Sequence, residues 1–145
     1  MATVLVIDDE PDVLLLCRVN LEHAGHRVLE ASDGNEGLAE AVSERPDAIL
    51  LDVMLPEVDG FEVLTTLRSG HLVEVPVVLL TARARWEDQV KGWQAGAADY
   101  VIKPFSPASL VDAVERALRS SPEELQERRA GALRRLLGTD APGTA

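Results

Sequence analysis

Five short segments rich in aliphatic residues recur along the chain, and most of them lack regular alternation of apolar and polar positions. They comprise residues 3–7, 27–30, 48–55, 76–80 and 99–103. Non-alternating aliphatic runs of this length are typical of strands covered on both faces in a parallel sheet. The segments therefore predict five buried or half-buried strands.

Apolar residues between these segments recur at helical spacing. The intervals that carry them are residues 11–24, 34–45, 60–69, 86–95 and 107–120. Strands that alternate with helices predict a doubly wound α/β fold, because parallel strands need right-handed helical crossovers on both faces of the sheet. We expect a five-stranded parallel sheet of order 2-1-3-4-5 with five helices, and residues 1–120 as one domain.

The last part of the chain predicts one more helix rather than a second domain. Ser121 and Glu124 form a capping box with Pro122 at the first helical position, and a partial apolar face runs from there to Leu137. We expect a helical extension over 121–137 and a disordered tail over 138–145. The extension is interpreted as a docking helix, a linker stub or a solvated helix. Its acidic and basic blocks slightly favour pairing with a second copy.

Composition narrows the choice of function and location. The 145 residues are 46% hydrophobic with a net charge of −11, which suits one globular domain and would repel nucleic acid. We expect no direct contact with nucleic acid. The single cysteine, Cys17, lies in an apolar helical stripe and is interpreted as a packing residue. No leader or membrane-spanning run is evident, so we expect a cytoplasmic protein without membrane contact.

Polar side chains follow four of the predicted strands. Asp8 and Asp9 follow the first strand and Thr81 follows the fourth, whereas Asp52 and Lys103 stand where the third and fifth segments stop being strands. In a sheet of order 2-1-3-4-5, the first and third strands flank the switch point, where ligands bind at the carboxyl ends. Each of these residues alone is more often a cap or a surface group. Their joint occurrence at one edge of the sheet favours a functional site.

Oxygen ligands of this kind suit Mg²⁺, with Mn²⁺ as the alternative ion. A zinc site is not expected, because His23, His26 and His71 lack ligand spacing and a cysteine companion. We interpret the three histidines as surface residues.

These motifs resemble the receiver domain of bacterial two-component response regulators, over about residues 3–120. The resemblance implies that Asp52 is the phosphoacceptor and that Asp8, Asp9, Asp52 and the backbone carbonyl of Met54 bind the metal. By the same resemblance, Thr81 and Lys103 stabilise the phosphoryl group, Thr81 and Tyr100 form the switch, and the Lys103–Pro104 peptide bond is cis. Pro56 and Gly60 would shape the loop around the site.

The resemblance also implies a mechanism and partners. A sensor histidine kinase or a phosphotransfer protein would donate the phosphoryl group, and output would pass through protein contacts of the fourth helix and fifth strand, with a homodimer through the C-terminal helix as a candidate. The chain would be a signalling receiver with only self-catalysed phosphotransfer and autodephosphorylation. Alternatives are a receiver fragment of a larger kinase, cyclase or transcription regulator, and a phosphatase of the haloacid dehalogenase type. The phosphatase needs an acid two residues after its nucleophile, where this chain has Met54.

Overall fold

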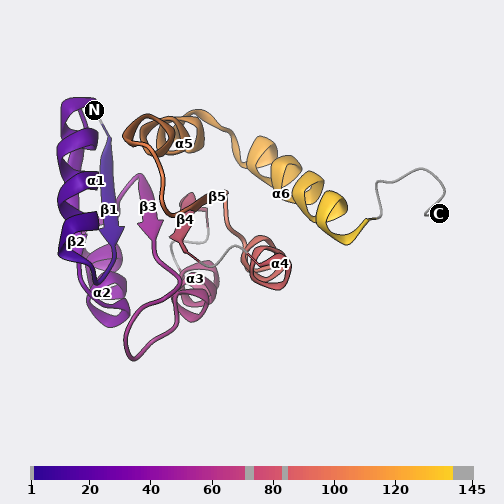
Figure 1. Ribbon diagram of the computed structural model, residues 1–145. Coiled ribbons are helices and arrows are strands. Elements are labelled where there is room, and N and C mark those ends of the chain that lie inside the picture. Colours follow the sequence, from indigo (N-terminus) through magenta and orange to yellow (C-terminus); the bar gives the residue numbers. More distant parts are fainter. Residues whose placement is uncertain (1, 71–73, 83–84, 139–145) are drawn as a thin grey trace.

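The sheet predicted from the strand pattern is present in the computed structural model, which describes residues 2–70, 74–82 and 85–138. Five parallel strands lie in the order β2-β1-β3-β4-β5, as expected (Figure 1). Their bounds are β1 Thr3–Ile7, β2 Arg27–Ala31, β3 Ala48–Leu51, β4 Val77–Thr81 and β5 Asp99–Ile102. The chain therefore has a switch point between β1 and β3.

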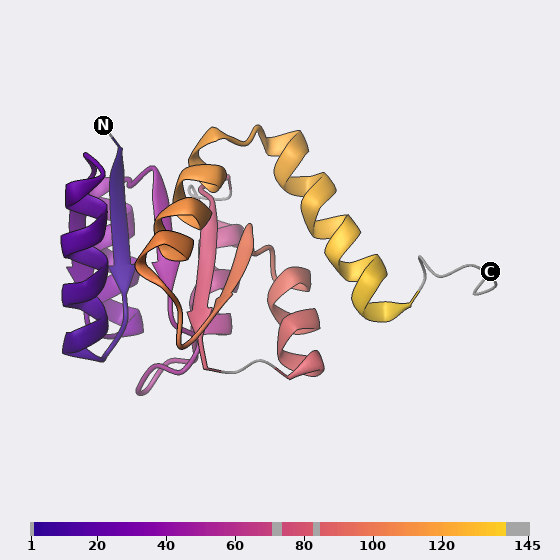
Figure 2. The ribbon, with the colours of Figure 1, turned by 45° about the horizontal axis from the view of Figure 1, so that its top comes forward.

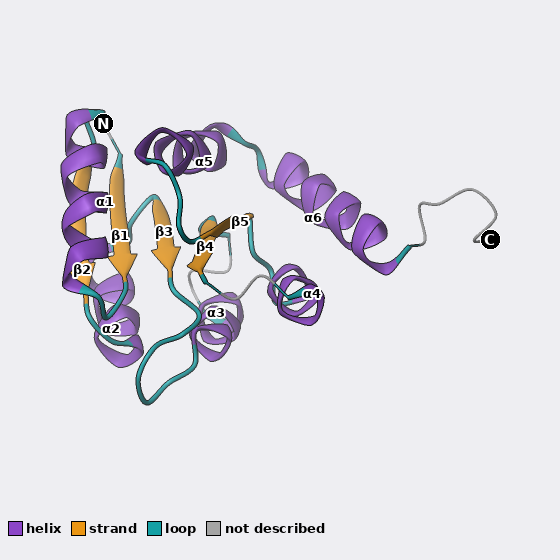
Figure 3. Cartoon of the chain, in the orientation of Figure 1, coloured by secondary structure: helices purple, strands orange, loops and turns teal. Residues whose placement is uncertain are grey.

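Helices cover both faces of this sheet. Their bounds are α1 Pro11–His23, α2 Gly34–Glu44, α3 Gly60–Ser69, α4 Trp86–Gln94, α5 Pro107–Arg119 and α6 Pro122–Leu137. Helices α1 and α5 lie on one face, whereas α2, α3 and α4 lie on the other (Figures 1 and 3). The sixth helix continues beyond α5, so the described chain has the predicted α/β core with a helical extension. No helix among the described residues is long and apolar enough to cross a bilayer.

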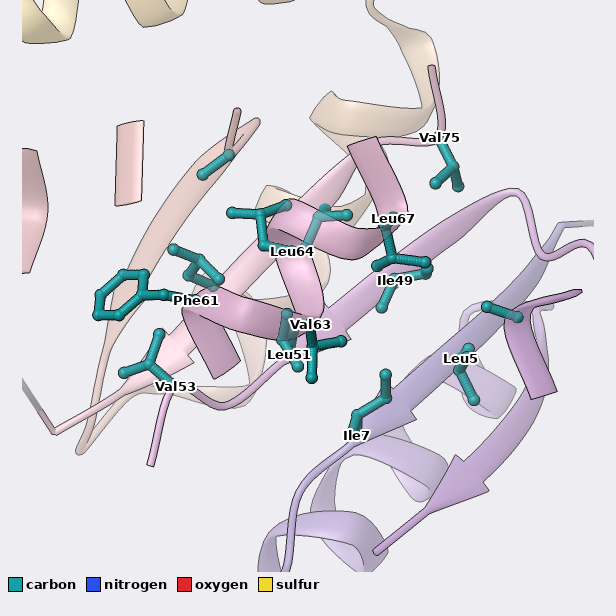
Figure 4. Close-up of a cluster of buried hydrophobic side chains, with 14 of the residues drawn as sticks. Leu5, Ile7, Ile49, Leu51, Val53, Phe61, Val63, Leu64, Leu67 and Val75 are labelled. Carbon is teal, nitrogen blue, oxygen red and sulfur yellow. The ribbon is translucent and has the colours of Figure 1, made fainter. Parts of the chain in front are cut away.

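Two apolar cores result, one on each face of the sheet. The first joins α2 and α3 to the sheet, with the side chains of Phe61, Leu64 and Leu67 directed from α3 toward the strands (Figure 4). The second joins α1 and α5 to the opposite face and includes Cys17. The Cys17 side chain is fully buried, and burial raises the pKa of its thiol to about 12. The interpretation of Cys17 as a packing residue is consistent with this position.

Side-chain caps begin four of the helices, and the one at Ser121 was predicted. The side chains of Asp33, Asp59, Ser106 and Ser121 each accept a hydrogen bond from a backbone N–H of the first turn that follows. At Ser121 the reciprocal bond from the backbone N–H to Glu124 completes a capping box. These caps satisfy amide groups that the helix itself leaves without partners.

The C-terminal helix α6 packs within its own chain. It runs alongside α4, and Figure 2 shows the two helices side by side. Leu125 and Ala132 are its buried residues, and the Trp86 indole Nε1 donates to the backbone carbonyl of Leu136. The slight preference for pairing with a second copy is therefore not what the structure shows, and a homodimer stays a prediction. Helix α6 ends at Gly138 in a left-handed cap, so the first residue of the tail predicted as disordered (138–145) belongs to the helix cap, and residues 139–145 lie outside the described part of the chain.

Candidate functional site

Two buried aspartates stand side by side at the carboxyl edge of the sheet. Asp8 directly follows β1 and Asp52 directly follows β3, and the pairing of these strands brings Ile7 opposite Leu51. The side chain of Asp8 is fully buried and Asp52 is 2% exposed. The Asp52 amide continues the ladder by donating to the Ile7 carbonyl at 2.9 Å. Sheet pairing therefore fixes the distance between the two acids.

Each aspartate uses one oxygen for the backbone and one for Lys103. Asp52 Oδ1 accepts from the Met54 amide at 2.9 Å, and Asp8 Oδ1 accepts from the Glu10 amide at 2.9 Å. The Lys103 Nζ donates to Asp8 Oδ2, to Asp52 Oδ2 and to Glu10 Oε1, each at 3.0 Å. One ammonium group thus serves three carboxylates.

Charge is out of balance in this cluster. Burial raises the pKa of Asp8 from 3.8 to about 6, and the nearby charge of Asp52 acts in the same direction, against hydrogen bonds from Glu10 and Lys103. Burial alone would lower the pKa of Lys103, but its hydrogen bonds to Asp52, Glu10 and Asp8 outweigh that effect and raise it. The site is therefore an acidic cluster in which one ammonium group faces several carboxylates.

The carboxylates that gather here include one that sequence reasoning did not select. Ligand oxygens of Asp8, Asp9, Glu10 and Asp52 lie within 4.8 Å of one another. Glu10 belongs to the same acidic run as Asp8 and Asp9, and that run was its only signal in the sequence. A grouping of carboxylate oxygens fits a hard divalent cation, because such ions take oxygen ligands and relieve the excess negative charge.

The loop after β3 approaches the site closely. Met54 places its amide on Asp52 while its side chain is 54% exposed. A Cβ added at Gly60 would lie 2.4 Å from the Asp52 carbonyl oxygen and 2.4 Å from the Val53 Cα, so this position has room only for glycine. Between these residues, Glu57 adopts a left-handed φ of 67°. The loop is thus held against the backbone of Asp52 itself.

Thr81 and Lys103 complete the same edge. Thr81 ends β4 and is fully buried, and its carbonyl accepts from the Lys103 amide at 2.8 Å. Lys103 follows β5, and its peptide bond to Pro104 is cis. The structure therefore brings together at this edge Asp8, Asp9, Asp52, Thr81 and Lys103.

Tyr100 lies farther from the carboxylates, on β5 beside α4. The side chain is half-buried, and a Cβ placed on Gly92 would lie 3.0 Å from its ring. Helix α4 therefore packs directly on this ring. Asp99, the preceding residue, accepts from Arg116 of α5 at 2.9 Å.

Neither of the two described histidines belongs to the acidic cluster, and one of them is not a surface residue. His26 is 10% exposed at its side chain, and its Nε2 lies 3.4 Å from Glu115 Oε2. His23 is exposed, and His71 lies outside the described residues. The expectation of surface exposure was wrong for His26, because the turn after α1 folds its ring against α5.

Comparison with known proteins identifies the family to which the chain belongs. Residues 4–115 match the family described as the response regulator receiver domain. The chain belongs to this family. The crystal structure of the chemotaxis response regulator CheY4 of Vibrio cholerae is similar to this receiver domain, with a TM-score of 0.77 and 34% identity over 81% of this chain and 98% of that one.

Two curated relatives are longer than this receiver domain. The alkaline phosphatase synthesis transcriptional regulatory protein PhoP of Bacillus subtilis is 47% identical over 118 residues, which is 81% of this chain and 49% of that protein. The transcriptional regulatory protein PrrA of Mycobacterium tuberculosis is 47% identical over 116 residues, 80% of this chain and 49% of that protein. The chain thus spans about half the length of these relatives.

Proposed function

We propose that Asp52 accepts a phosphoryl group from a phosphohistidine of a sensor kinase or of a phosphotransfer protein. The observation that carries this proposal is the position of Asp52, whose Oδ2 lies 3.0 Å from Lys103 Nζ within a group of four carboxylates. Asp8 is equally buried and shares Lys103, and with Asp9 it is proposed to hold the cation rather than to accept the phosphoryl group. Membership of a family that acts in phosphorelay signalling supports the same assignment.

The proposed transfer forms one bond and breaks another. An oxygen of the Asp52 carboxylate attacks phosphorus, the bond from phosphorus to the histidine nitrogen breaks, and that nitrogen keeps the electron pair. The Met54 amide and the Lys103 ammonium orient the carboxylate before the attack. Thr81 ends the neighbouring strand at the same edge, where its hydroxyl would donate to a phosphoryl oxygen after transfer.

A divalent cation fits this site. Asp8, Asp9 and Asp52 would hold it, with the Met54 carbonyl as a further ligand and Mg²⁺ or Mn²⁺ as the ion. When bound, it would neutralise charge that develops on the phosphoryl oxygens. Glu10 also lies in the cluster and would compete for the same cation or keep its contact with Lys103.

A phosphatase of the haloacid dehalogenase type fits less well. That reaction needs an acid two residues after the nucleophile, and here Met54 contributes only its backbone amide to Asp52. We therefore propose a signalling receiver whose own chemistry is limited to phosphotransfer and autodephosphorylation.

Output is proposed to pass through protein contacts around α4 and β5. Tyr100 of β5 packs on α4, and α4 begins five residues after Thr81. The half-length match to transcriptional regulators also keeps open a role as the receiver part of a longer regulator. Contact with nucleic acid is not proposed for the described residues, because the net charge of the chain is −11.

Incubation with acetyl phosphate and Mg²⁺ tests the assignment. Intact mass spectrometry should show one added phosphoryl group on the parent protein and on Asp112→Asn, which changes an exposed carboxylate of α5. Asp52→Asn should remain unlabelled, and chelation of Mg²⁺ should abolish labelling of the parent. Equal labelling of Asp52→Asn and the parent would refute Asp52 as the phosphoacceptor.

A further inference from the structure

Helix α6 covers part of the surface that the proposed function needs. It lies along α4, with its first turns near the end of α4 and its last turn near the start, where Trp86 donates to the Leu136 carbonyl (Figure 2). Near the middle of α6, Arg128 Nη1 donates to the carbonyl of Ala98, the residue before β5. The outer side of α4 is therefore occupied by a helix of the same chain.

Few side chains of α6 are buried where it packs on the domain. Leu125 and Ala132 are the buried residues of a 16-residue helix, and Leu137 is 46% exposed. The Arg129 Nε is buried and has no hydrogen-bond partner among the described residues. A buried donor without an acceptor opposes docking, because it has lost water and gained nothing in return.

Like charges also face each other at this contact. Arg68 of α3 donates to the Gly96 carbonyl through Nε and Nη2, and Arg129 of α6 lines the same small cavity. Burial lowers the pKa of Arg68 to about 10, and the charge of Arg129 adds to that effect. Departure of α6 removes the charge of Arg129 from this cavity and leaves Arg68 with the acid Glu74, which also lines it.

The phosphoacceptor edge and the seat of α6 meet at α4. Thr81 lies at the carboxyl edge of the sheet beside Lys103, five residues before α4 begins. On the other side, Gly92 of α4 approaches the sheet so closely that a Cβ there would lie 2.7 Å from Leu79 and 3.0 Å from the Tyr100 ring. A displacement of the Tyr100 ring would therefore displace α4, because a Cβ at Gly92 would already lie 3.0 Å from that ring.

We propose that α6 is a reversible cover of α4, and that phosphorylation of Asp52 releases it. The proposal rests on the proposed function of Asp52. In the unphosphorylated chain, α6 lies along α4 and accepts the indole hydrogen bond of Trp86, although Trp86 itself is 50% exposed. In the phosphorylated chain, the shift of α4 removes the Trp86 and Leu136 contact, and α6 detaches about the Ser120–Ser121 link.

Detachment of α6 should also affect how readily Asp52 is phosphorylated. Two equilibria that are coupled must influence each other by the same factor. A substitution that loosens α6 should therefore favour phosphorylation of Asp52. A released helix of 16 residues is marginal in water, so it should lose its amide protection.

Hydrogen exchange of the full-length chain, with and without acetyl phosphate and Mg²⁺, tests the release. Exchange over 122–137 should rise by about tenfold or more on phosphorylation, within the usual range for coupled sites. Amides of β1 and β3 serve as the internal control for an intact fold, and Asp52→Asn should show no change. Intact mass measured on the same samples reports the phosphoryl group.

Ala132→Glu provides the reciprocal arm, since it places a carboxylate at a buried position of α6, and Ala130→Glu places one at an exposed position of the same helix. Ala132→Glu should raise exchange over 122–137 without phosphate and increase the phosphorylated fraction several-fold, and Ala130→Glu should do neither. Trp86→Phe, which removes only the indole donor and keeps an aromatic ring, should act in the same direction as Ala132→Glu.

The outcomes separate the two proposals. Absence of a phosphoryl group on Asp52 would overturn the proposed function. A fully phosphorylated chain with unchanged exchange over 122–137 would overturn the cover and leave the proposed function standing. Equal phosphorylated fractions in Ala132→Glu and Ala130→Glu, with α6 detached only in the former, would also overturn it.

Discussion

Lys103 Nζ lies 3.0 Å from Asp8 Oδ2 and 3.0 Å from Asp52 Oδ2, so a single ammonium group bridges the two acids that end β1 and β3. The bridge crosses the switch point of the sheet and ties β5 to both strands. Removal of Lys103 would leave two buried carboxylates without a cation, which is far more costly than loss of a surface pair.

Lys103→Ala should lower the free energy of unfolding by on the order of 3 kcal/mol in Mg²⁺-free buffer. The loss should be larger at pH 8 than at pH 5, because the two acids can take up protons at the lower pH and escape their mutual repulsion. Thermal denaturation at both pH values measures the effect. Lys91→Ala, which removes an exposed lysine above the Phe61 ring, is the matched control. Similar losses in both variants would contradict the bridge.

Asp8→Asn should stabilise the metal-free protein at neutral pH. The pKa of Asp8 is raised from 3.8 to about 6 in the folded protein, so the folded state holds the proton more tightly and stability falls as pH rises from about 4 to 6. An amide avoids that loss, which amounts to on the order of 3 kcal/mol above pH 6. Below pH 4 the gain should vanish, since the acid is protonated in both states.

Melting curves of Asp8→Asn and of the parent protein at pH 7.5 and at pH 3.5, without divalent cations, measure the difference in stability at each pH. The same substitution should weaken Mg²⁺ binding in a calorimetric titration, because it removes a charged ligand. A variant that is less stable than the parent at pH 7.5 would mean that the hydrogen bond to Lys103 outweighs the burial of the charge.

Gly60→Ala should destabilise the fold by on the order of 2–4 kcal/mol. The new methyl group would meet backbone atoms of Asp52 and Val53 at 2.4 Å, and backbone cannot rotate aside as a side chain can. Gly131→Ala is the control in α6, where the nearest atom would be 3.5 Å away, and it should stabilise by about 0.5–1 kcal/mol through helix propensity. Chemical denaturation of both variants measures the two changes in the free energy of unfolding. A stabilised Gly60→Ala or a destabilised Gly131→Ala would contradict the prediction.

Leu125→Ala should lower the melting temperature, because Leu125 is 8% exposed and belongs to the core formed by α1 and α5. We expect a loss of about 2–3 kcal/mol, independent of protein concentration. Leu137→Ala, at a 46% exposed position of the same helix, should change little. A melting temperature that rises with protein concentration would instead indicate that α6 packs between two copies.

Much of the site could be predicted from the chain alone, and the reason is topological. Non-alternating strands separated by helices permit few arrangements, and a parallel sheet carries every strand end to one edge. Asp8, Asp52 and Lys103 therefore met because each directly follows a strand. No side-chain detail was needed for that step.

Other features depend on details that no pattern encodes. The contact of Glu10 with Lys103 comes from one rotamer of a long, exposed side chain. The surface on which α6 packs was not predictable. A narrow apolar face indicates that a helix needs a packing surface, but it does not indicate which surface that is. Burial of His26 likewise follows from the turn after α1, where the polar ring gave no signal.

The two ends of α4 are held by different contacts, and Arg68 supplies those at its C-terminal end. Its guanidinium group donates to the Gly96 carbonyl at 3.1 and 2.8 Å and to the Val75 carbonyl at 2.7 Å. These hydrogen bonds connect the turn that follows α4 to α3 and to the segment before β4. The opposite end of the helix, at Trp86, rests on the backbone of α6 instead. A helix fixed at one end moves as a lever, and a small shift beside Tyr100 would be magnified toward Trp86.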